Sequence, residues 1–133
     1  MLHLEIVTPD QKIYSDDVDS VVIPGVEGEL GVLPQHVPLM TQLLPGELRV
    51  LKGGEELCLA VGEGFVEISA DKVAVLTDMA VKESEIDGTA AEEAVRRAEE
   101  SMKDSKLDDE EYATVKASLQ KSLALVRVKR RRS

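Results

Sequence analysis

Hydrophobic and polar positions alternate with a period of two along most of the first 77 residues. Leu2, Leu4 and Ile6 alternate with polar neighbours, and the apolar run 21–23 ends at Pro24-Gly25. This period is typical of strands that bury one face. The pattern predicts strands over 2–6, 21–23, 47–51, 55–61, 65–69 and 72–76.

The turns between these runs have explicit chemistry. Gly53-Gly54 separates 48–51 from 57–59, and two glycines favour a two-residue hairpin turn of the primed type. Ala70-Asp71 separates two further β-rich runs. Many short strands with such turns predict an all-β N-terminal antiparallel sandwich or barrel, and no βαβ unit is visible.

The period changes from two to about 3.6 after Met79, which divides the chain into a β domain over 1–84 and an α-helical hairpin over 85–133. Asp87 is the expected N-cap of the first helix. The stripes of the two helices, joined at 104–108, are Ala90, Ala91, Ala94, Val95, Ala98 and Met102, then Tyr112, Val115, Leu119, Leu123 and Val126. A helix pair this thin is expected to dock on another surface or to sample more than one position.

The segment 26–39 combines flexible and rigid backbone positions. Gly28 and Gly31 permit turns or bulges, whereas Pro34 and Pro38 fix φ and push the preceding residues towards extended geometry. We therefore expect a shaped surface loop that presents Glu29. Loops on a rigid scaffold often carry function, although an ordinary β-bulge turn fits the same composition.

Charge is segregated along this chain of net charge −10. Residues 1–84 hold 15 acids and 5 bases, residues 85–111 hold 11 acids and 4 bases, and residues 112–133 hold 7 bases and no acid. A basic end suits nucleic acid, a membrane surface or an acidic protein patch. Nucleic acid is disfavoured as a partner, because the acidic remainder repels phosphate and no aromatic residue interrupts the basic run.

Catalytic chemistry is not evident in the sequence, which lacks a Ser/His/Asp constellation, a phosphate loop and metal-ligand spacing. We expect no cofactor and no metal. His36 is expected to hydrogen-bond to backbone, and the single Cys58 to pack as a small hydrophobe. No apolar run approaches the roughly 18 residues that span a bilayer, and the N-terminus lacks a basic n-region. These features predict a cytosolic, non-catalytic chain.

One run resembles a family signature. Residues 28–39 read G-E-L-G-V-L-P-Q-H-V-P-L, which resembles the G-E-L-G-(I/V)-x-P-x-H-x-P-L signature of the epsilon subunit of bacterial and chloroplast F-type ATP synthases. The resemblance continues over 4–9, 45–50, 62–68, 97–100 and 125–128.

The resemblance implies a central-stalk subunit of a proton-translocating synthase, which links gamma to the c-ring. It would be peripheral on the cytoplasmic face of the inner (plasma) membrane, or in the plastid on the thylakoid, and would meet the membrane only indirectly. One face of the sandwich would pack on gamma. The residues implied to contact the c-ring are Gly28, Glu29, Leu30, Gly31 and His36.

The resemblance also implies that the C-terminal hairpin inhibits ATP hydrolysis by contacting the alpha/beta subunits. The bases that would meet an acidic segment of beta are Lys116, Lys121, Arg127, Lys129 and Arg130, followed by Arg131 and Arg132. Opposite charge would supply an attraction that salt weakens. On composition alone, a solvated helix end fits this segment equally well.

Some family members bind ATP through a motif (I/L)-D-x-x-R-A at the start of the first helix. The matching stretch here is Ile86-Asp87-Gly88-Thr89-Ala90-Ala91, so Asp87 is retained as a candidate nucleotide ligand while Ala90 replaces the arginine. We therefore expect no ATP binding at a useful affinity. The alternative functions are an ATP-sensing regulatory module and a non-rotary β-sandwich adaptor.

Overall fold

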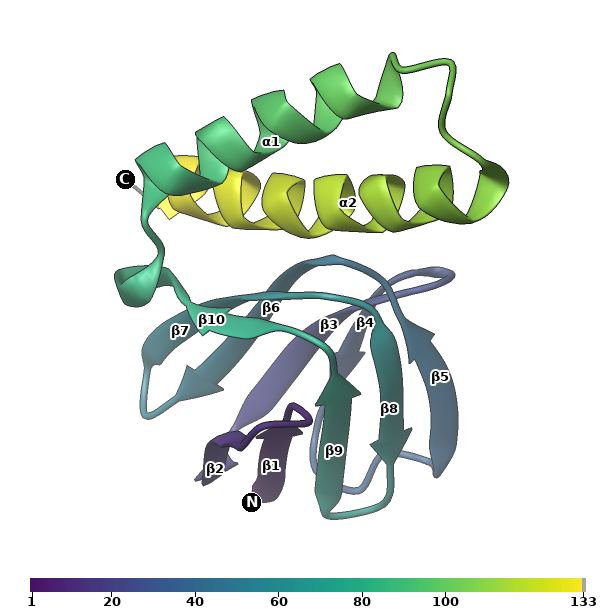
Figure 1. Ribbon diagram of the computed structural model, residues 1–133. Helices are drawn as coiled ribbons and strands as arrows, with labels where there is room; N and C mark the ends of the chain where they lie inside the picture. Colours follow the sequence, from purple (N-terminus) through teal and green to yellow (C-terminus); the bar gives the residue numbers. More distant parts are fainter. Residues whose placement is uncertain (133) are drawn as a thin grey trace.

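The computed structural model describes residues 1–132, apart from the side chain of Arg132. Ten strands form one curved sheet that folds over on itself, and two helices lie across it (Figure 1). The strands are β1 (Leu2–Val7), β2 (Lys12–Val18), β3 (Ser20–Gly25), β4 (Gly28–Val32), β5 (Leu39–Leu43), β6 (Gly46–Lys52), β7 (Glu55–Val61), β8 (Gly64–Ile68), β9 (Lys72–Thr77) and β10 (Ala80–Lys82). A 3₁₀ turn, η1 (Glu83–Glu85), leads to α1 (Gly88–Met102) and α2 (Asp109–Arg132).

The strand order is β10-β7-β6-β3-β5-β8-β9-β1-β2, with β4 beside β3. The predicted alternation buries one face of each strand, so that Leu2, Leu4 and Ile6 are fully buried. Strands from both ends of the order contribute to one apolar core, which includes Val21, Leu48, Leu59, Val66 and Val75. The predicted all-β sandwich followed by a helical hairpin is confirmed.

Several details differ from the sequence prediction. β1 pairs with β9 in parallel, so the sheet is not wholly antiparallel. Alternation marks which face is buried but carries no information on strand direction or partner. β2, β5 and the short β10 were not predicted, because their apolar positions are sparse or irregular. The turn at Gly53-Gly54 is confirmed: Lys52 pairs with Glu55, and both glycines have positive φ.

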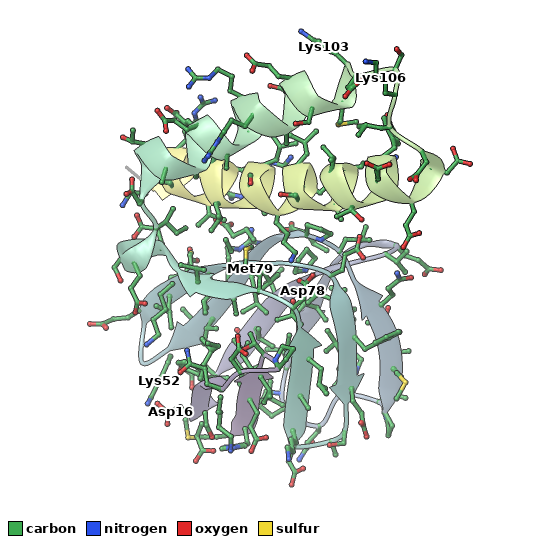
Figure 2. The ribbon with its side chains drawn as sticks, in the orientation of Figure 1. Asp16, Lys52, Asp78, Met79, Lys103 and Lys106 are labelled. Carbon is green, nitrogen blue, oxygen red and sulfur yellow. The ribbon has the colours of Figure 1, made fainter. Side chains whose placement is uncertain are left out.

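The helical hairpin is docked on the sandwich. α2 lies between the strands and α1 (Figure 1), and it packs on β6 and β7. A second buried cluster joins the two parts, formed by Cys58, Ala60, Ile86 and Val128 with Met79, Val81 and Leu125 around it. Met79 lies directly beneath α2 in Figure 2. Cys58 is 5% exposed, which confirms that it packs as a small hydrophobe.

The predicted stripe of α1 is only partly buried. Ala91 and Ala98 are covered, whereas Ala90 is exposed. On α2, Tyr112 is 43% exposed, while Ala124 and Val128 are buried without having been predicted. The burial of Ala124 and Val128 follows from the arrangement in Figure 1, where α2 turns one face to the strands. α1 diverges from α2 towards their connection, which leaves Tyr112 in the first turn of α2 uncovered.

Candidate functional site

The segment around Glu29 is a β-hairpin, not the surface loop that the sequence predicted. β3 and β4 pair from Val21↔Val32 to Gly25↔Gly28, and Val26-Glu27 forms the turn. Gly28 has φ +111°, a conformation that favours glycine. The loop prediction is wrong for 28–32, since the glycines allow a strand along β3 and only residues 33–38 remain irregular.

Glu29 lies on the outer face of this hairpin, where an arginine from another strand meets it. Glu29 Oε2 is 3.0 Å from Arg49 Nη1, and the same nitrogen is 3.3 Å from Glu47 Oε1. Burial by itself would lower the pKa of Arg49. The hydrogen bond to Glu47 and the charge of Glu29 outweigh burial, so the pKa of Arg49 is raised. The site is therefore an acidic pair bridged by one fixed cation.

His36 is separated from Glu29 by the length of β4. Its Nδ1 lies 2.6 Å from the carbonyl oxygen of Val37, which confirms the predicted hydrogen bond to backbone. Its neighbour Gln35 has φ 67° and donates its N–H to the carbonyl of Ala70 in the β8–β9 turn. Gly28, Glu29, Leu30, Gly31 and His36 thus do not share one loop: the first four lie on β4, and His36 follows its far end.

Most of the predicted basic contact residues of α2 form ion pairs within the chain. Lys121 Nζ is 3.1 Å from Asp78 Oδ2, a residue that Figure 2 shows beneath α2. Lys129 pairs with Glu83 of η1 at 3.5 Å.

Two arginines near the end of α2 also have acidic partners. Arg130 pairs with Glu92 of α1 at 3.0 Å, and Arg131 Nη1 lies 3.1 Å from Glu47 Oε1. Lys116 and Arg127 are exposed. The side chain of Arg132 lies outside the described residues.

Asp87, the candidate nucleotide ligand, caps α1. Its Oδ1 accepts a hydrogen bond from Ala90 N at 3.1 Å, as the N-cap prediction required. Beside it, a Cβ added to Gly88 would lie 3.3 Å from Cγ of Lys129. Arg97, two turns further along α1, instead lines a groove of about 430 Å³ between the helices, at Ala98 and Val115. The capping carboxylate and the arginine are therefore not brought together.

An exposed apolar patch on the sandwich was missed at the sequence level. Met40, Phe65 and Leu76 are 67%, 60% and 52% exposed, on the adjacent strands β5, β8 and β9. Phe65 lies opposite Leu76 and Gln42 in the register. The sequence did contain a signal for this patch. Phe65 and Glu67 are two residues apart on one strand, so they lie on the same face, and the charged Glu67 faces outward.

Over residues 1–132, no three His, Cys, Asp or Glu side chains come together in a way that could hold a metal ion. In the same part of the chain, neither helix is both long and apolar enough to cross a bilayer. The candidate functional sites are therefore three surfaces, namely the β3–β4 hairpin, the apolar patch of Met40, Phe65 and Leu76, and the basic face of α2.

The fold and these surfaces define a class of protein, a β-sandwich that carries a docked helical hairpin. Residues 1–83 match the family model described as ATP synthase, Delta/Epsilon chain, beta-sandwich domain, and residues 84–130 match the long alpha-helix domain of the same chain. The chain belongs to the ATP synthase delta/epsilon chain family.

Curated relatives and solved structures agree. The chain is 44% identical to the ATP synthase epsilon chain of Dehalococcoides mccartyi, over 98% of this chain and 94% of that one. It is 40% identical to that of Halorhodospira halophila, covering 95% and 90%. A chain in the mitochondrial ATP synthase of Euglena gracilis, solved as OSCP/F1/c-ring in rotational state 1, matches with TM-score 0.79 and 27% identity, over 93% of this chain and 78% of that chain. The resemblance to the epsilon subunit, a non-catalytic subunit of ATP synthase, is thereby confirmed.

Proposed function

We propose that the chain is a central-stalk subunit that links gamma to the c-ring of a proton-translocating synthase, on the cytoplasmic face of the membrane. In this proposal residues 1–84 form the rotor-binding unit, and residues 85–133 form the regulatory unit. The observation that carries it is the match over 93% of this chain to a subunit within a solved F1/c-ring assembly. The arrangement of surfaces supports three separate contacts.

The contact with gamma is assigned to the apolar patch of Met40, Phe65 and Leu76. An isolated exposed apolar residue is ordinary, but three on adjacent strands indicate a surface that another chain covers. Phe65 is the single phenylalanine of the chain, and aromatic side chains dominate binding energy at protein interfaces. α2 packs on β6 and β7, and this leaves the patch on β5, β8 and β9 open.

The contact with the c-ring is assigned to the β3–β4 hairpin. β4 pairs with β3 on one edge only, so the hairpin projects a rigid strand with Glu27 and Glu29 near its tip. The Glu29 side chain is 58% exposed although it pairs with Arg49, which leaves carboxylate surface for a cationic or polar group of the ring. His36 would contribute from the other end of β4.

The contact with the alpha/beta subunits is assigned to the basic face of α2, acting as a brake on ATP hydrolysis. Lys116 and Arg127 are exposed with the hairpin docked. Lys121, Lys129 and Arg130 are held by Asp78, Glu83 and Glu92. Lys121 and Lys129 would become available to an acidic segment of beta only when the helical hairpin leaves the sandwich, whereas the Arg130–Glu92 pair lies within that hairpin and is kept. Docked and inhibiting states thus compete for Lys121 and Lys129.

The test measures capture of gamma by the purified full-length chain. Phe65→Asp should weaken binding at least about tenfold, because a central aromatic anchor is replaced by a charge. The chain itself should stay folded, since Phe65 is 60% exposed. The matched control is Leu51→Asp, at a 41% exposed leucine on β6 outside the patch. Equal capture of gamma by wild type and Phe65→Asp would exclude this face, and failure of the wild type to capture gamma or c-ring would contradict the proposed function.

A further inference from the structure

Four charged side chains of alternating sign connect the β3–β4 hairpin to the end of α2. Glu29 of β4 pairs with Arg49 of β6 at 3.0 Å. Arg49 pairs with Glu47 of the same strand at 3.3 Å, and Glu47 pairs with Arg131 of α2 at 3.1 Å. The chain of contacts thus joins the proposed c-ring contact to the proposed brake.

Glu47 is the central member of this network. Its side chain is 7% exposed, whereas those of Glu29 and Arg131 are 58% and 57% exposed. A carboxylate this buried depends on its cations, because water is not available to solvate it. Arg49 and Arg131 both approach the same oxygen, Oε1. The strength with which Glu47 binds one of these arginines therefore depends on the charge of the other arginine.

We infer that Glu47 couples the state of Glu29 to the docking of α2. While Glu29 neutralises Arg49, Glu47 retains charge for Arg131, and the end of α2 is held. When Glu29 is neutralised or engaged by another cation, the full charge of Arg49 falls on Glu47 and repels Arg131. The end of α2 is then released. Removal of the charge of Arg49 should instead strengthen the docking of α2, because Arg49 then no longer competes with Arg131 for the carboxylate of Glu47.

The physiological meaning of this coupling rests on the proposed function. A basic group of the ring that pairs with Glu29 would favour undocking of the helical hairpin. Assembly with the ring would then free α2 for its proposed contact with the alpha/beta subunits. The coupling itself is a property of the chain and can be measured without any other subunit. Its failure and the failure of the proposed function are therefore distinguishable.

Cys58 supplies a native reporter of docking. It is the single cysteine, it is 5% exposed, and it shares a buried cluster with Val128 of α2. Undocking of α2 uncovers its thiol. With maleimide in excess, and when the helical hairpin undocks and redocks faster than the thiol reacts, the labelling rate is proportional to the fraction of molecules in which the hairpin is undocked. The full-length chain is used throughout, with denaturant unfolding of each variant as a check of the fold.

Glu29→Gln should raise the labelling rate about two- to fivefold at low salt, the range expected for partly exposed ion pairs. Arg49→Gln should lower it. In an Arg131→Gln background, Glu29→Gln should have a smaller effect, because the link from Glu47 to Arg131 is missing. The matched control is Glu27→Gln, the same charge change in the turn of the same hairpin, which should leave the rate unchanged. High salt should reduce the effect of Glu29→Gln.

Two results would overturn the inference. One is an equal labelling rate for Glu29→Gln and Glu27→Gln, which would show that the net charge of the β3–β4 hairpin matters and the specific contact of Glu29 with Arg49 does not. The other is an effect of Glu29→Gln that persists undiminished in the Arg131→Gln background. Because Glu29 is largely exposed, its substitution leaves the core intact, and the test stands even if Arg49→Gln fails to fold.

Discussion

At the scale of single residues, Asp16 and Lys52 show how a surface pair responds to pH. Their side chains point towards one another between β2 and β6 (Figure 2), and they form a hydrogen bond and an ion pair. The hydrogen bond from Lys52 is the main reason that the pKa of Asp16 lies below its ordinary value of 3.8. Because the folded-state pKa is lowered, the stabilisation is present above the ordinary value and is lost as pH falls through the folded-state value.

Asp16→Asn should therefore lower the denaturant midpoint of unfolding at about pH 7, and its effect should shrink as pH falls below the ordinary value of 3.8 and through the lowered folded-state value. The control is Asp10→Asn, at an exposed acid in the β1–β2 turn. A difference between wild type and Asp16→Asn that does not depend on pH would show that packing, not charge, is responsible.

A second prediction at this scale concerns Ala90. The isolated chain should not bind MgATP below the millimolar range, because the cation of the motif is missing. Ala90→Arg should restore binding by roughly ten- to a hundredfold, since charge-assisted hydrogen bonds contribute roughly 1.5 to 3 kcal/mol. Ala90 is exposed, so an arginine fits without disturbing the helix pair. Calorimetric titration decides the matter, with Ala90→Gln as the uncharged control and saturable wild-type binding as the contradicting outcome.

The sequence predicted residues whose role depends on local chemistry. The role of Asp87 as an N-cap and the hydrogen bond from His36 to backbone are confirmed. It did not predict Glu29–Arg49 or Asp16–Lys52, whose partners are brought together only by strand pairing across the sheet. The patch at Phe65 was predictable from strand parity, but the exposed face of a strand is found only after its buried face has been assigned.

At the scale of elements, burial patterns were predictable and partners were not. β6 to β9 have the expected positions within one or two residues, because each carries a clear apolar alternation between turns. β4 was misread as a loop, since glycines and prolines weaken the strand signal there. The docked position of α2 could not be deduced, because Cys58, Ala60 and Val128 form their cluster only when outer-face strand residues meet the helix.

The sandwich should remain folded when residues 85–133 are removed, because every member of its main core lies at or before Val75. The loss of stability should be about 1 to 2 kcal/mol, as small outer-face side chains such as Cys58 and Ala60 gain solvent. Denaturant unfolding of residues 1–84 should remain cooperative. For comparison, Leu59→Ala in the same truncated chain should cost roughly 2 to 5 kcal/mol. Absence of a cooperative transition in the truncated chain would show that α2 is part of the essential core.

At the scale of the whole molecule, the proposed brake on ATP hydrolysis can be tested in the assembled complex. Removal of residues 85–133 should raise ATP hydrolysis. Lys116→Gln together with Arg127→Gln should reproduce part of the increase, because these exposed bases serve no ion pair that holds the docked state over residues 1–132. High salt should shrink the difference, since the attraction is between exposed charges.

The control pair is Lys103→Gln with Lys106→Gln, at the connection between the helices (Figure 2), which removes the same charge from the other end of the hairpin. Hydrolysis rates that are the same for full-length and truncated complexes, at low and at high salt, would contradict the brake.

The parallel pairing of β1 with β9 also determines when the sandwich can form. β1 is the first strand to be synthesised, yet it lies between β2 and β9, and His3 pairs with Lys72. Contacts so distant in sequence carry a large loop-closure entropy and slow folding. A nascent chain that ends before Lys72 holds β1 with one edge open. Covering of β1 is therefore a late event in biosynthesis, which requires residues 72–76 of β9.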